Sequence, residues 1–289
     1  MRVVQLSDIH FGGEDAAALD AATTYVTADP PDLVMVTGDL TLNGTPREFR
    51  SAELWLARLP NPLLVTPGNH DTPYWNLPLR ALQPFKRYRR FIGQPSASRY
   101  DVAGLHARTI NTSRGAQPRF DWSKGAVSLK LASAAAEAIT AFPADEIRII
   151  GCHHPLMEIT GTPVTGGVHR GQTAAKLFCD RGIDIILTGH VHTPFAVALP
   201  FGDGQTYAVG AGTLSVRTRG APPGFNVLEI SPGCVEVTAL GWIGAALEIH
   251  RVWRLPRRSA PEGAAPEPKL SRAEVVVQNE GPSAAAGPS

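Results

Sequence analysis

The sequence predicts an α/β fold in which a mostly parallel sheet is covered by helices. Short β-branched segments at residues 2–6, 33–36 and 63–65 alternate with longer segments of helical period at residues 15–28 and 46–59. This βαβαβ order favours parallel strands joined by helical crossovers. In such sheets, ligand sites lie at the carboxyl ends of the strands. We therefore expect functional side chains directly after the predicted strands.

Residues 73–104 interrupt this alternation, because the strand signal is lost there. The segment 77–92 carries four arginines and a lysine among apolar residues, which predicts a helical insert near the site. Its basic cluster at residues 86–90 fits the solvated face of a helix. The alternative interpretation is contact with substrate phosphate or nucleic acid, since arginine binds phosphate through paired hydrogen bonds.

Alternation resumes in the second half of the chain. We expect strands near residues 107–111, 147–152 and 184–187, and helices near residues 129–142 and 173–181. Glycine and proline then separate four short strands, which predicts an antiparallel closing sheet built from residues 207–209, 225–230, 235–240 and 246–253.

Residues 1–255 form one predicted domain, and residues 256–289 differ from it in composition. The latter are rich in proline, alanine, glycine, serine and glutamate, with a single apolar island at residues 275–277. Such a composition cannot bury enough apolar surface to offset the entropy cost of ordering. We therefore expect a disordered tail.

The overall charge is almost neutral, with 27 lysines and arginines against 26 aspartates and glutamates. No global field therefore draws the chain to nucleic acid or to an anionic membrane. The three cysteines are scattered singly, which fits a reducing compartment. The amino terminus lacks the pattern of a signal peptide, and no apolar segment reaches the ~20 residues that span a bilayer. These observations predict a cytoplasmic protein.

Five short polar clusters each follow a predicted strand. Their sequences are Asp8-Ile9-His10, Gly38-Asp39, Gly68-Asn69-His70-Asp71, His153-His154-Pro155 and Gly189-His190-Val191-His192. Residues i and i+2 of an extended segment point to the same side, so Asp8 and His10 are expected to aim at one point. The same reasoning applies to His190 and His192. Glycines in three of the clusters allow the backbone to turn sharply and approach an ion closely.

Imidazole, carboxylate and amide donors together suit zinc, manganese, iron or cobalt better than a soft metal. The clusters contain enough donors for two ions, with Asp39 as the candidate bridge. If Asp39 bridges, one site can be completed by Asp8, His10 and His192 and the other by Asn69, His153 and His190. Two divalent ions carry four positive charges against two carboxylates, which leaves two positive charges to activate water and hold a phosphate.

The ordered clusters D-x-H, GD, GNHD, H-H-P and GHxH resemble those of the calcineurin-like metallophosphoesterases over roughly residues 1–240. The segments LSDIHFG, GDLTLNG and GNHD are similar to the bacterial class III cyclic-nucleotide phosphodiesterases and to glycerophosphodiesterase-like relatives. The resemblance implies a four-layer αββα sandwich of mixed sheets. It also implies two divalent or mixed-valence metal ions at the strand carboxyl ends. The division of the seven donors between them, with Asp39 as the bridge, is likewise what the resemblance implies.

By the same resemblance, the histidine of GNHD lies beside the substrate phosphate without binding metal. Here that residue is His70, which together with Asn69 would contact the substrate. A histidine is suited to proton transfer near neutral pH, so His70 is the candidate acid for the leaving oxygen. Asp71 or another carboxylate is expected to orient it.

Several residues near the clusters allow a second interpretation. His153 and His154 compete for one ligand position; the motif favours His153, with His154 as a structural residue or a hydrogen-bond donor behind the ligands. The loop residues His169 and Arg170 fit either substrate contact or a solvated loop tip. Cys152 is expected to be a small core residue and not a nucleophile.

We therefore predict hydrolysis of a small phosphodiester, with 3′,5′-cyclic AMP as the first candidate by resemblance and a homodimer as an allowed assembly. The enzyme alternatives are a glycerophosphodiesterase, a phosphomonoesterase, a nucleotide-sugar lipid pyrophosphohydrolase and a nuclease. The alternative of another class is a metal-stabilised scaffold without turnover, against which His70 argues. Because the motifs supply no arginine, a singly charged diester is favoured over a doubly charged monoester unless Arg89, Arg90 or Arg170 reaches the site.

Overall fold

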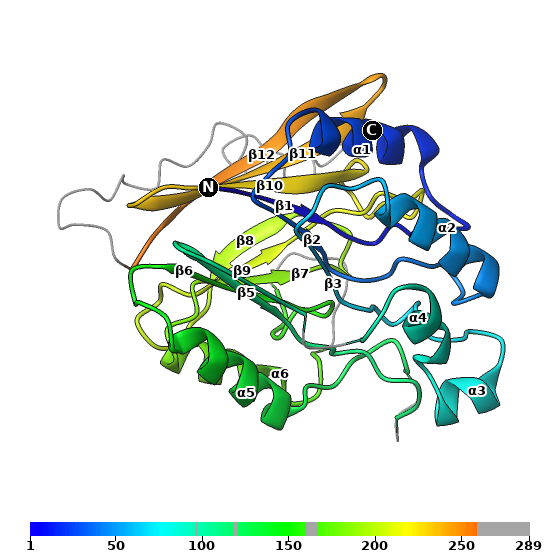
Figure 1. Cartoon of the computed structure of the whole chain (residues 1–289), viewed down its shortest axis with the longest axis horizontal. Helices are drawn as coiled ribbons and strands as arrows, with labels where there is room; N and C mark the ends of the chain where they lie inside the picture. The colour runs from blue at the N-terminus through cyan, green and yellow to red at the C-terminus, as the bar shows by residue number, and fades with distance from the viewer. Residues whose placement is uncertain (96–97, 118–120, 160–166, 259–289) are drawn as a thin grey trace, which may run out of the picture.

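Two six-stranded sheets pack face to face at the centre of the molecule (Figure 1). The computed structural model describes residues 1–95, 98–117, 121–159 and 167–258. The first sheet contains, in spatial order, β12 (Ala246–Pro256), β11 (Cys234–Ile243), β10 (Gly224–Ile230), β1 (Arg2–Leu6), β2 (Leu33–Val36) and β3 (Leu63–Val65). The second contains β4 (Arg99–Val102), β5 (Leu105–Thr109), β6 (Ile147–Gly151), β7 (Ile185–Thr188), β9 (Tyr207–Gly210) and β8 (Phe195–Ala198).

Both sheets are mixed. In the first sheet, β1, β2 and β3 are parallel, while β10, β11 and β12 add to β1 in antiparallel order. In the second sheet, β5, β6, β7 and β9 are parallel, and the edge strands β4 and β8 are antiparallel to their neighbours. The carboxyl ends of the parallel strands are therefore the place where loops from both sheets can meet.

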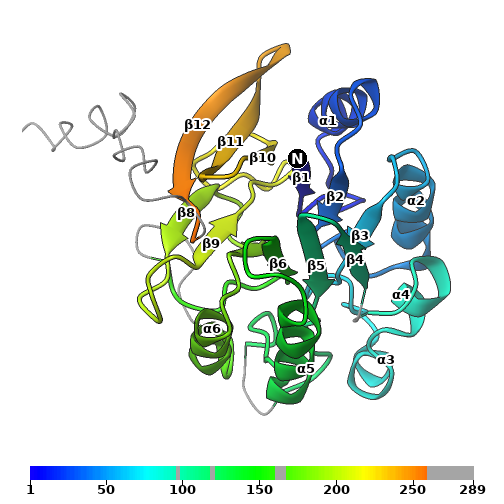
Figure 2. The ribbon, with the colours of Figure 1, turned by 60° about the vertical axis from the view of Figure 1, so that its left-hand side comes forward.

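Helices form the outer layers on both sides of the sheets (Figures 1 and 2). Helices α1 (Ala16–Ala28) and α2 (Pro46–Leu56) pack on the first sheet, whereas α5 (Leu129–Thr140) and α6 (Gly171–Asp180) pack on the second. None of the helices in the described ranges is both long and apolar enough to cross a bilayer.

Polar residues determine where the first two helices begin. The Asp15 carboxylate accepts a hydrogen bond from the N–H of Ala18 at the start of α1. At the start of α2, the Thr45 hydroxyl accepts from the N–H of Glu48, and the Glu48 carboxylate accepts from the N–H of Thr45. These caps satisfy backbone donors that the first helical turn leaves unpaired.

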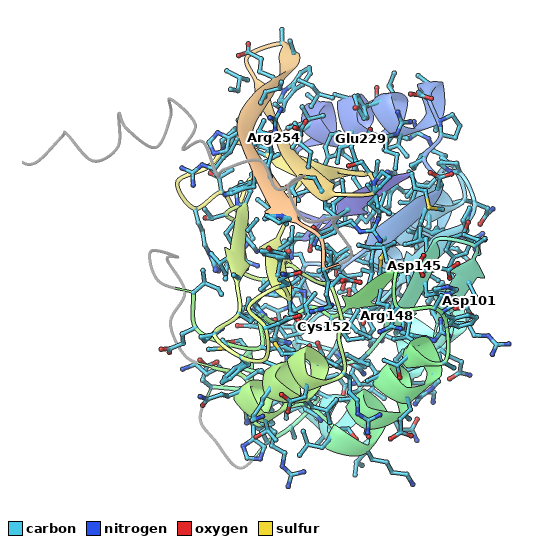
Figure 3. All side chains as sticks on the ribbon, turned by 90° about the vertical axis from the view of Figure 1, so that its left-hand side faces the viewer. Asp101, Asp145, Arg148, Cys152, Glu229 and Arg254 are labelled. Atoms are coloured by element: carbon cyan, nitrogen blue, oxygen red, sulfur yellow. The ribbon has the colours of Figure 1, made fainter. Side chains whose placement is uncertain are left out.

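Side chains fill the interior of the molecule (Figure 3). The buried clusters between the sheets and under each helical layer are apolar. Between the sheets, Val3 and Met35 of the first sheet belong to the same buried cluster as Ile149 and Leu187 of the second. Cys152 lies in the cluster under α5 and α6, as expected of a core residue. The layer order helix, sheet, sheet, helix confirms the predicted αββα sandwich.

The insert predicted at residues 77–92 contains two short helices in place of one. They are α3 (Leu77–Leu82) and α4 (Lys86–Phe91). Pro84 lies between them, and proline lacks an N–H and disfavours helical backbone in the residue before it. The same region also contains strand β4, which the sequence did not predict because it is an edge strand with alternate residues exposed.

The closing sheet was predicted correctly for β10, β11 and β12, but wrongly for residues 207–209. That segment belongs to β9, which pairs in parallel with β7 in the second sheet and is joined there by the unpredicted strand β8. Strand β12 extends to Pro256. The disordered tail predicted at residues 256–289, with its apolar island at residues 275–277, lies outside the described residues from residue 259 onward.

Candidate metal centre

Loops from five strand ends meet at one edge of the sandwich. The loop after β1 carries Asp8 and His10, that after β2 carries Asp39, that after β3 carries Asn69, that after β6 carries His153, and that after β7 carries His190 and His192. The structure brings these seven predicted side chains together. Asp8, His10 and His192 form one group, and Asp8, Asp39 and His153 form another. In each group, the atoms that could bind a metal lie within 4.8 Å of one another.

Asp8, His10 and His192 form the first group. Oδ1 of Asp8 lies 3.1 Å from Nε2 of His192 and 3.8 Å from Nε2 of His10. The two Nε2 atoms are 3.3 Å apart. All three side chains are buried. Three donor atoms thus face one small region in the interior.

Asn69, His153 and His190 form the second group. Oδ1 of Asn69 lies 3.2 Å from Nε2 of His153 and 3.0 Å from Nδ1 of His190. Asp39 lies between the two groups, because its Oδ2 is 3.3 Å from Nε2 of His153 and 3.8 Å from Nε2 of His10. This arrangement supports the interpretation of Asp39 as a bridge.

Backbone carbonyls determine which ring nitrogen carries the proton in two of the histidines. Nδ1 of His153 lies 2.8 Å from the carbonyl oxygen of Thr37, and Nδ1 of His192 lies 2.6 Å from that of Arg217. A carbonyl oxygen only accepts, so each Nδ1 donates and each Nε2 is the ring nitrogen directed at the centre. Histidines that bind metals in proteins are held in this way by a partner behind the ring.

One oxygen of Asp8 fits a cation. Oδ2 accepts hydrogen bonds from the hydroxyl of Ser7 at 2.6 Å and from the N–H of His190 at 2.9 Å. Oδ1 is buried and has no hydrogen-bond partner among the described residues. A buried carboxylate oxygen without a partner is costly unless a cation compensates its charge. Together with the imidazole and amide donors around it, this oxygen fits divalent transition-metal ions.

Five of the seven side chains come from residues with left-handed backbone. The φ angles are 54° at Asp8, 50° at His10, 51° at Asp39, 70° at His190 and 60° at His192. Such conformations cost on the order of 1–3 kcal/mol each and gather at functional sites. The predicted convergence of Asp8 with His10 is therefore found, but its predicted reason is wrong, because these segments are not extended.

Glycines permit the close approach of loops around the site. A Cβ atom at Gly68 would overlap the side chain of Asp39, and a Cβ atom at Gly189 would overlap those of Ser7 and Asp8. Any other residue at these two positions would push the carboxylates away from their neighbours. The glycines predicted to allow close approach to an ion thus allow close approach to the proposed ligands themselves.

Burial and charge shift the pKa values of the site in opposite directions. Burial lowers the pKa of His10 to about 3. Burial also opposes protonation of His153, but the charge of Asp39, its hydrogen bond to the ring and the charge of Asp8 together raise the pKa of His153 to about 9. Likewise, burial would raise the pKa of Asp39, whereas His153 and His70 hold it well below its usual range. Asp39 is therefore an ionised carboxylate in the interior.

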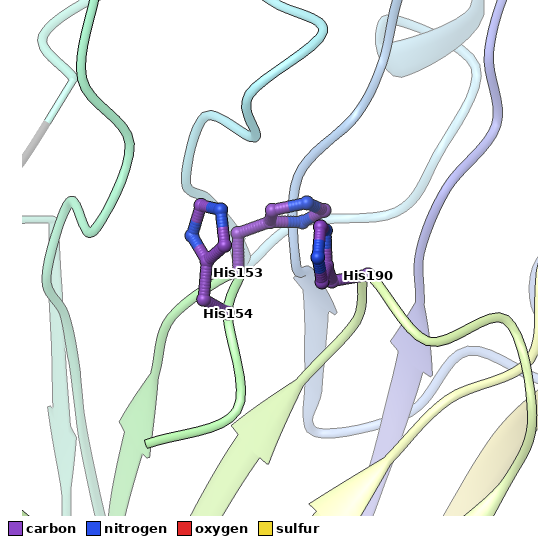
Figure 4. A group of neighbouring side chains, drawn as sticks. All are labelled: His153, His154 and His190. Carbon is purple, nitrogen blue, oxygen red and sulfur yellow. The ribbon is translucent and has the colours of Figure 1, made fainter. Parts of the chain in front are cut away.

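His154 takes part in the loop structure behind the site. Its Nε2 donates to the carbonyl oxygen of Ser123 at 2.7 Å, so its Nδ1 accepts from the hydroxyl of Thr112 at 2.8 Å. Both ring nitrogens are thereby used within the protein. Figure 4 shows the neighbouring His153 ring reaching toward His190, with His154 standing to one side. The hydrogen bonds favour the structural role for His154.

Asp71 holds two loops of the site together. Its carboxylate accepts hydrogen bonds from the N–H groups of Leu40, Thr41 and Gly68 at 2.9–3.2 Å. Burial and the charge of Asp39 raise its pKa to about 7. The expectation that a carboxylate orients His70 is wrong, because Nδ1 of His70 faces the carbonyl oxygen of Leu42 at 2.7 Å.

His70 lies next to an arginine that the sequence motifs did not indicate. Nη1 of Arg217 is 3.1 Å from Nε2 of His70. A guanidinium group only donates, so Nε2 accepts, while Nδ1 donates to the Leu42 carbonyl. In this arrangement Nε2 of His70 faces Arg217. The ring also lies edge-on to His10, with centroids 4.8 Å apart, which places both His70 and Arg217 at the first donor group.

Arg219 is the second arginine that sequence reasoning missed. Its Nη1 donates to the carbonyl oxygen of His190 at 3.2 Å, and its own carbonyl accepts from the hydroxyl of Thr193. Arg217 and Arg219 belong to the loop after β9, which is parallel to β7. The sequence analysis assigned residues 207–209 to the antiparallel sheet. An assignment to the parallel sheet would have indicated the loop after β9, because sites lie at the carboxyl ends of parallel strands.

The arginines proposed earlier lie elsewhere. Arg89 and Arg90 are exposed residues of α4, which fits the solvated helix face predicted for the basic cluster. His169 and Arg170 are exposed at the start of α6. Within the described residues, none of the contacts of these four side chains connects them to the seven-residue centre.

Comparison with known proteins decides the family. The profile described as calcineurin-like phosphoesterase matches residues 1–194, about two thirds of the chain. The chain belongs to the calcineurin-like phosphoesterase family. It is a metal-dependent phosphoester hydrolase, as the resemblance implied, and this family uses divalent metals at clusters of histidine and aspartate such as those described above.

Two curated relatives are named as phosphodiesterases. The chain is 23% identical over 262 residues to a "Probable cyclic nucleotide phosphodiesterase" of a Synechococcus strain, which covers 84% of this chain and 92% of that protein. It is 34% identical over 82 residues to a "Probable glycerophosphodiester phosphodiesterase GpdQ" of Arcobacter nitrofigilis, which covers 25% of this chain and 30% of that protein.

A solved structure shares the fold. The purple acid phosphatase PPD1 from yellow lupin (Lupinus luteus) superposes with a TM-score of 0.62 at 14% identity, and the match covers 89% of this chain and 54% of that one. At this identity the similarity concerns the architecture alone. It agrees with the αββα order of the calcineurin-like phosphoesterases.

Proposed function

We propose that this calcineurin-like phosphoesterase is a phosphodiesterase with two metal ions, one in each donor group and both in contact with Asp39. The observation that carries the proposal is the convergence of two buried donor groups on one shared carboxylate. When bound, two divalent ions there would supply the Lewis acidity that activates water and stabilises charge on the phosphate. Zinc, manganese, iron and cobalt all match the donors.

His70 and Arg217 are proposed to act on the phosphate as a pair. An anionic phosphate next to Asn69 and His70 attracts the guanidinium of Arg217, which can form charge-assisted hydrogen bonds to its oxygens. Departure of Arg217 from His70 leaves Nε2 free to take up a proton and pass it to the leaving alkoxide. The Leu42 carbonyl holds Nδ1 throughout and so keeps Nε2 directed at the substrate.

The charge of the site bears on the choice between diester and monoester. The sequence motifs supplied no arginine and therefore favoured a diester, whereas the structure places Arg217 at His70 and Arg219 close by. Two added positive charges favour a doubly charged monoester as well. Phosphomonoester hydrolysis is therefore the second candidate, and the names of the two curated relatives keep the diester first.

Cyclic AMP is the first proposed substrate, because the longer of the two alignments is to a protein named for cyclic nucleotides. The test is turnover by purified, manganese-supplemented protein of cyclic AMP beside AMP, and of bis-nitrophenyl phosphate beside mono-nitrophenyl phosphate. Faster cleavage of both diesters is expected. Faster cleavage of both monoesters would establish the second candidate, and absence of turnover on all four would contradict both candidates.

The metal content of the same preparation tests the binuclear centre, with two ions per chain as the expected result. The cytoplasmic location stays a proposal, supported by three cysteines that are unpaired in the structure. Cell fractionation checks it.

A further inference from the structure

A cavity of about 530 Å³ opens beside Asn69 and His70, at the edge of the metal centre. Its walls come from two separate segments, residues 74–80 at the start of the insert and residues 121–123 before α5. Small-molecule sites in proteins have volumes of about 300–1,000 Å³. A group attached to a phosphate at His70 would extend directly into this space.

Three aromatic side chains line the cavity, and two of them are unusually accessible. Trp75 is 78% exposed and Tyr74 is 49% exposed, with their rings edge to face and their centroids 4.8 Å apart. Trp122 lies on the other wall. Exposed aromatic surface beside a reaction centre indicates a binding role, since flat rings offer large contact area at a low entropy cost.

The cavity also contains a fixed positive charge. Arg80 is 7% exposed, its Nε donates to the carbonyl oxygen of Gly115 at 2.9 Å, and its guanidinium carbon lies 5.7 Å from the ring centroid of Trp122. A buried cation over one aromatic face disfavours a second cation in the same space. Arg80 therefore opposes a quaternary ammonium group at the Trp122 face, where the aromatic ring would otherwise attract it, while the Asp121 carboxylate also lines the cavity.

The second wall is tied to the metal centre. The carbonyl oxygen of Ser123 accepts from Nε2 of His154, the residue next to the proposed ligand His153. The N–H of Ser123 in turn donates to the Asp121 carboxylate at 3.0 Å. Trp122 lies between these two anchored residues, so its wall is held in place before a ligand enters.

We propose that this cavity is the subsite for a planar heteroaromatic group of the nucleobase type carried by the substrate. Trp75 and Trp122 provide stacking faces, and Arg80 provides hydrogen-bond donors for the polar edge of the base. Glycerol has no flat face, and choline carries a positive charge. The inference rests on the proposed function in one respect, because that function places the phosphate at His70.

Ligand binding to the full-length, manganese-loaded protein tests the subsite. The probes are AMP, glycerol 3-phosphate, phosphocholine and inorganic phosphate, titrated by calorimetry. AMP is expected to bind at least about tenfold more tightly than glycerol 3-phosphate or phosphocholine, the usual effect of stacking one base on an aromatic side chain. Trp75→Ala should lower the AMP affinity by about the same factor and leave that of inorganic phosphate unchanged, whereas Trp75→Phe should keep most of it.

Leu82→Ala is the matched control, because Leu82 is an exposed apolar residue of α3 that does not line the cavity. Equal affinities for AMP and glycerol 3-phosphate would overturn the subsite, and so would tighter binding of phosphocholine. A Trp75→Ala variant that changes the oligomeric mass but not the AMP affinity would also overturn it, by showing that the aromatic residues pack against a second copy.

Adenosine, which has no phosphate, separates the subsite from the proposed function. It is expected to quench tryptophan fluorescence equally in the natural protein and in Asp39→Ala, and to do so far less in Trp75→Ala. This result supports the subsite even if every phosphoester proves inert. Conversely, metal-dependent turnover of phosphodiesters without any effect of Trp75→Ala on adenosine or AMP would leave the proposed function intact and overturn the subsite.

Discussion

Asp39 is the residue on which both donor groups depend. Its carboxylate faces His153 of one group at 3.3 Å and His10 of the other at 3.8 Å. We expect Asp39→Ala and the isosteric Asp39→Asn to abolish turnover and to lower the metal content from two ions per chain to less than one. Asp145→Ala, at an exposed position, is the control. Elemental analysis showing two retained ions in Asp39→Ala would contradict the bridge.

Substitution of His70 is expected to reduce turnover more for substrates whose leaving group needs a proton. His70→Ala should keep both ions and lose about 10²–10⁴-fold in turnover of cyclic AMP, the usual effect of removing an acid or base. Bis-nitrophenyl phosphate should lose less, because nitrophenolate leaves without a proton. His169→Ala, in an exposed loop, serves as control. Equal losses on both substrates would show that His70 acts on something other than the leaving oxygen.

Arg217 is expected to bind the phosphate itself. Arg217→Met should raise the KM for diesters and weaken inhibition by inorganic phosphate about tenfold or more, because a hydrogen bond to a charged group contributes about 1.5–3 kcal/mol. Arg217→Lys should restore part of the loss, since the charge remains while the planar fork does not. Arg170→Met is the exposed control. Unchanged phosphate inhibition in Arg217→Met would mean that Arg217 only supports His70 and His192.

At the scale of elements, helix α2 contributes stability without touching the centre. Thr45→Ala removes its capping box and should lower the free energy of unfolding by about 1 kcal/mol, or the Tm by about 2 °C. Thr27→Ala in the last turn of α1 is the control, since Thr27 caps no helix start. Turnover per metal-loaded molecule should be unchanged in both. A loss of metal in Thr45→Ala would show that α2 positions the nearby loop of Asp39.

The sequence predicted those elements whose signal is local. Strands β1, β2 and β3 were expected with the bounds that the structure shows, because buried β-branched segments specify them. Strands β4 and β8 were missed because half of the residues in each are exposed, which leaves too few buried apolar residues to mark a strand. Arg217 was missed for a different reason. Its position depends on the order of strands in the second sheet, and this order cannot be predicted from local hydrophobic periodicity.

The centre itself combines both kinds of information. Donors such as Asp8 and His10 stand in short motifs, so their identity could be predicted. Their left-handed backbone could not be, since non-glycine residues adopt it only when surrounding contacts impose it. The contact between the Leu42 carbonyl and His70 could not be predicted either, because every residue has a backbone carbonyl and the residue type does not show which one will accept a hydrogen bond. Sequence thus indicated which side chains meet, and the folded loops determine how.

For the whole molecule, the contacts of the last residues that the structure describes indicate where shortening the chain costs stability. The tail predicted to be disordered begins at residue 256, but Arg258 donates to Asp184 at 2.9 Å and to the carbonyl oxygen of Gly182 at 3.0 Å. Asp184 is buried, and burial raises its pKa in spite of Arg258. Removal of Arg258 therefore deprives a buried carboxylate of a charged partner.

We accordingly expect the chain 1–258 to melt at the temperature of the full chain and the chain 1–256 to melt about 3–8 °C lower, from a loss of about 1.5–3 kcal/mol. Arg258→Met in the full chain should reproduce most of that loss. Turnover should persist in all three proteins, because Arg258 lies far along the chain from the loops of the centre and contacts none of their proposed ligands. A lower Tm for the chain 1–258 would show that residues 259–289 stabilise the domain.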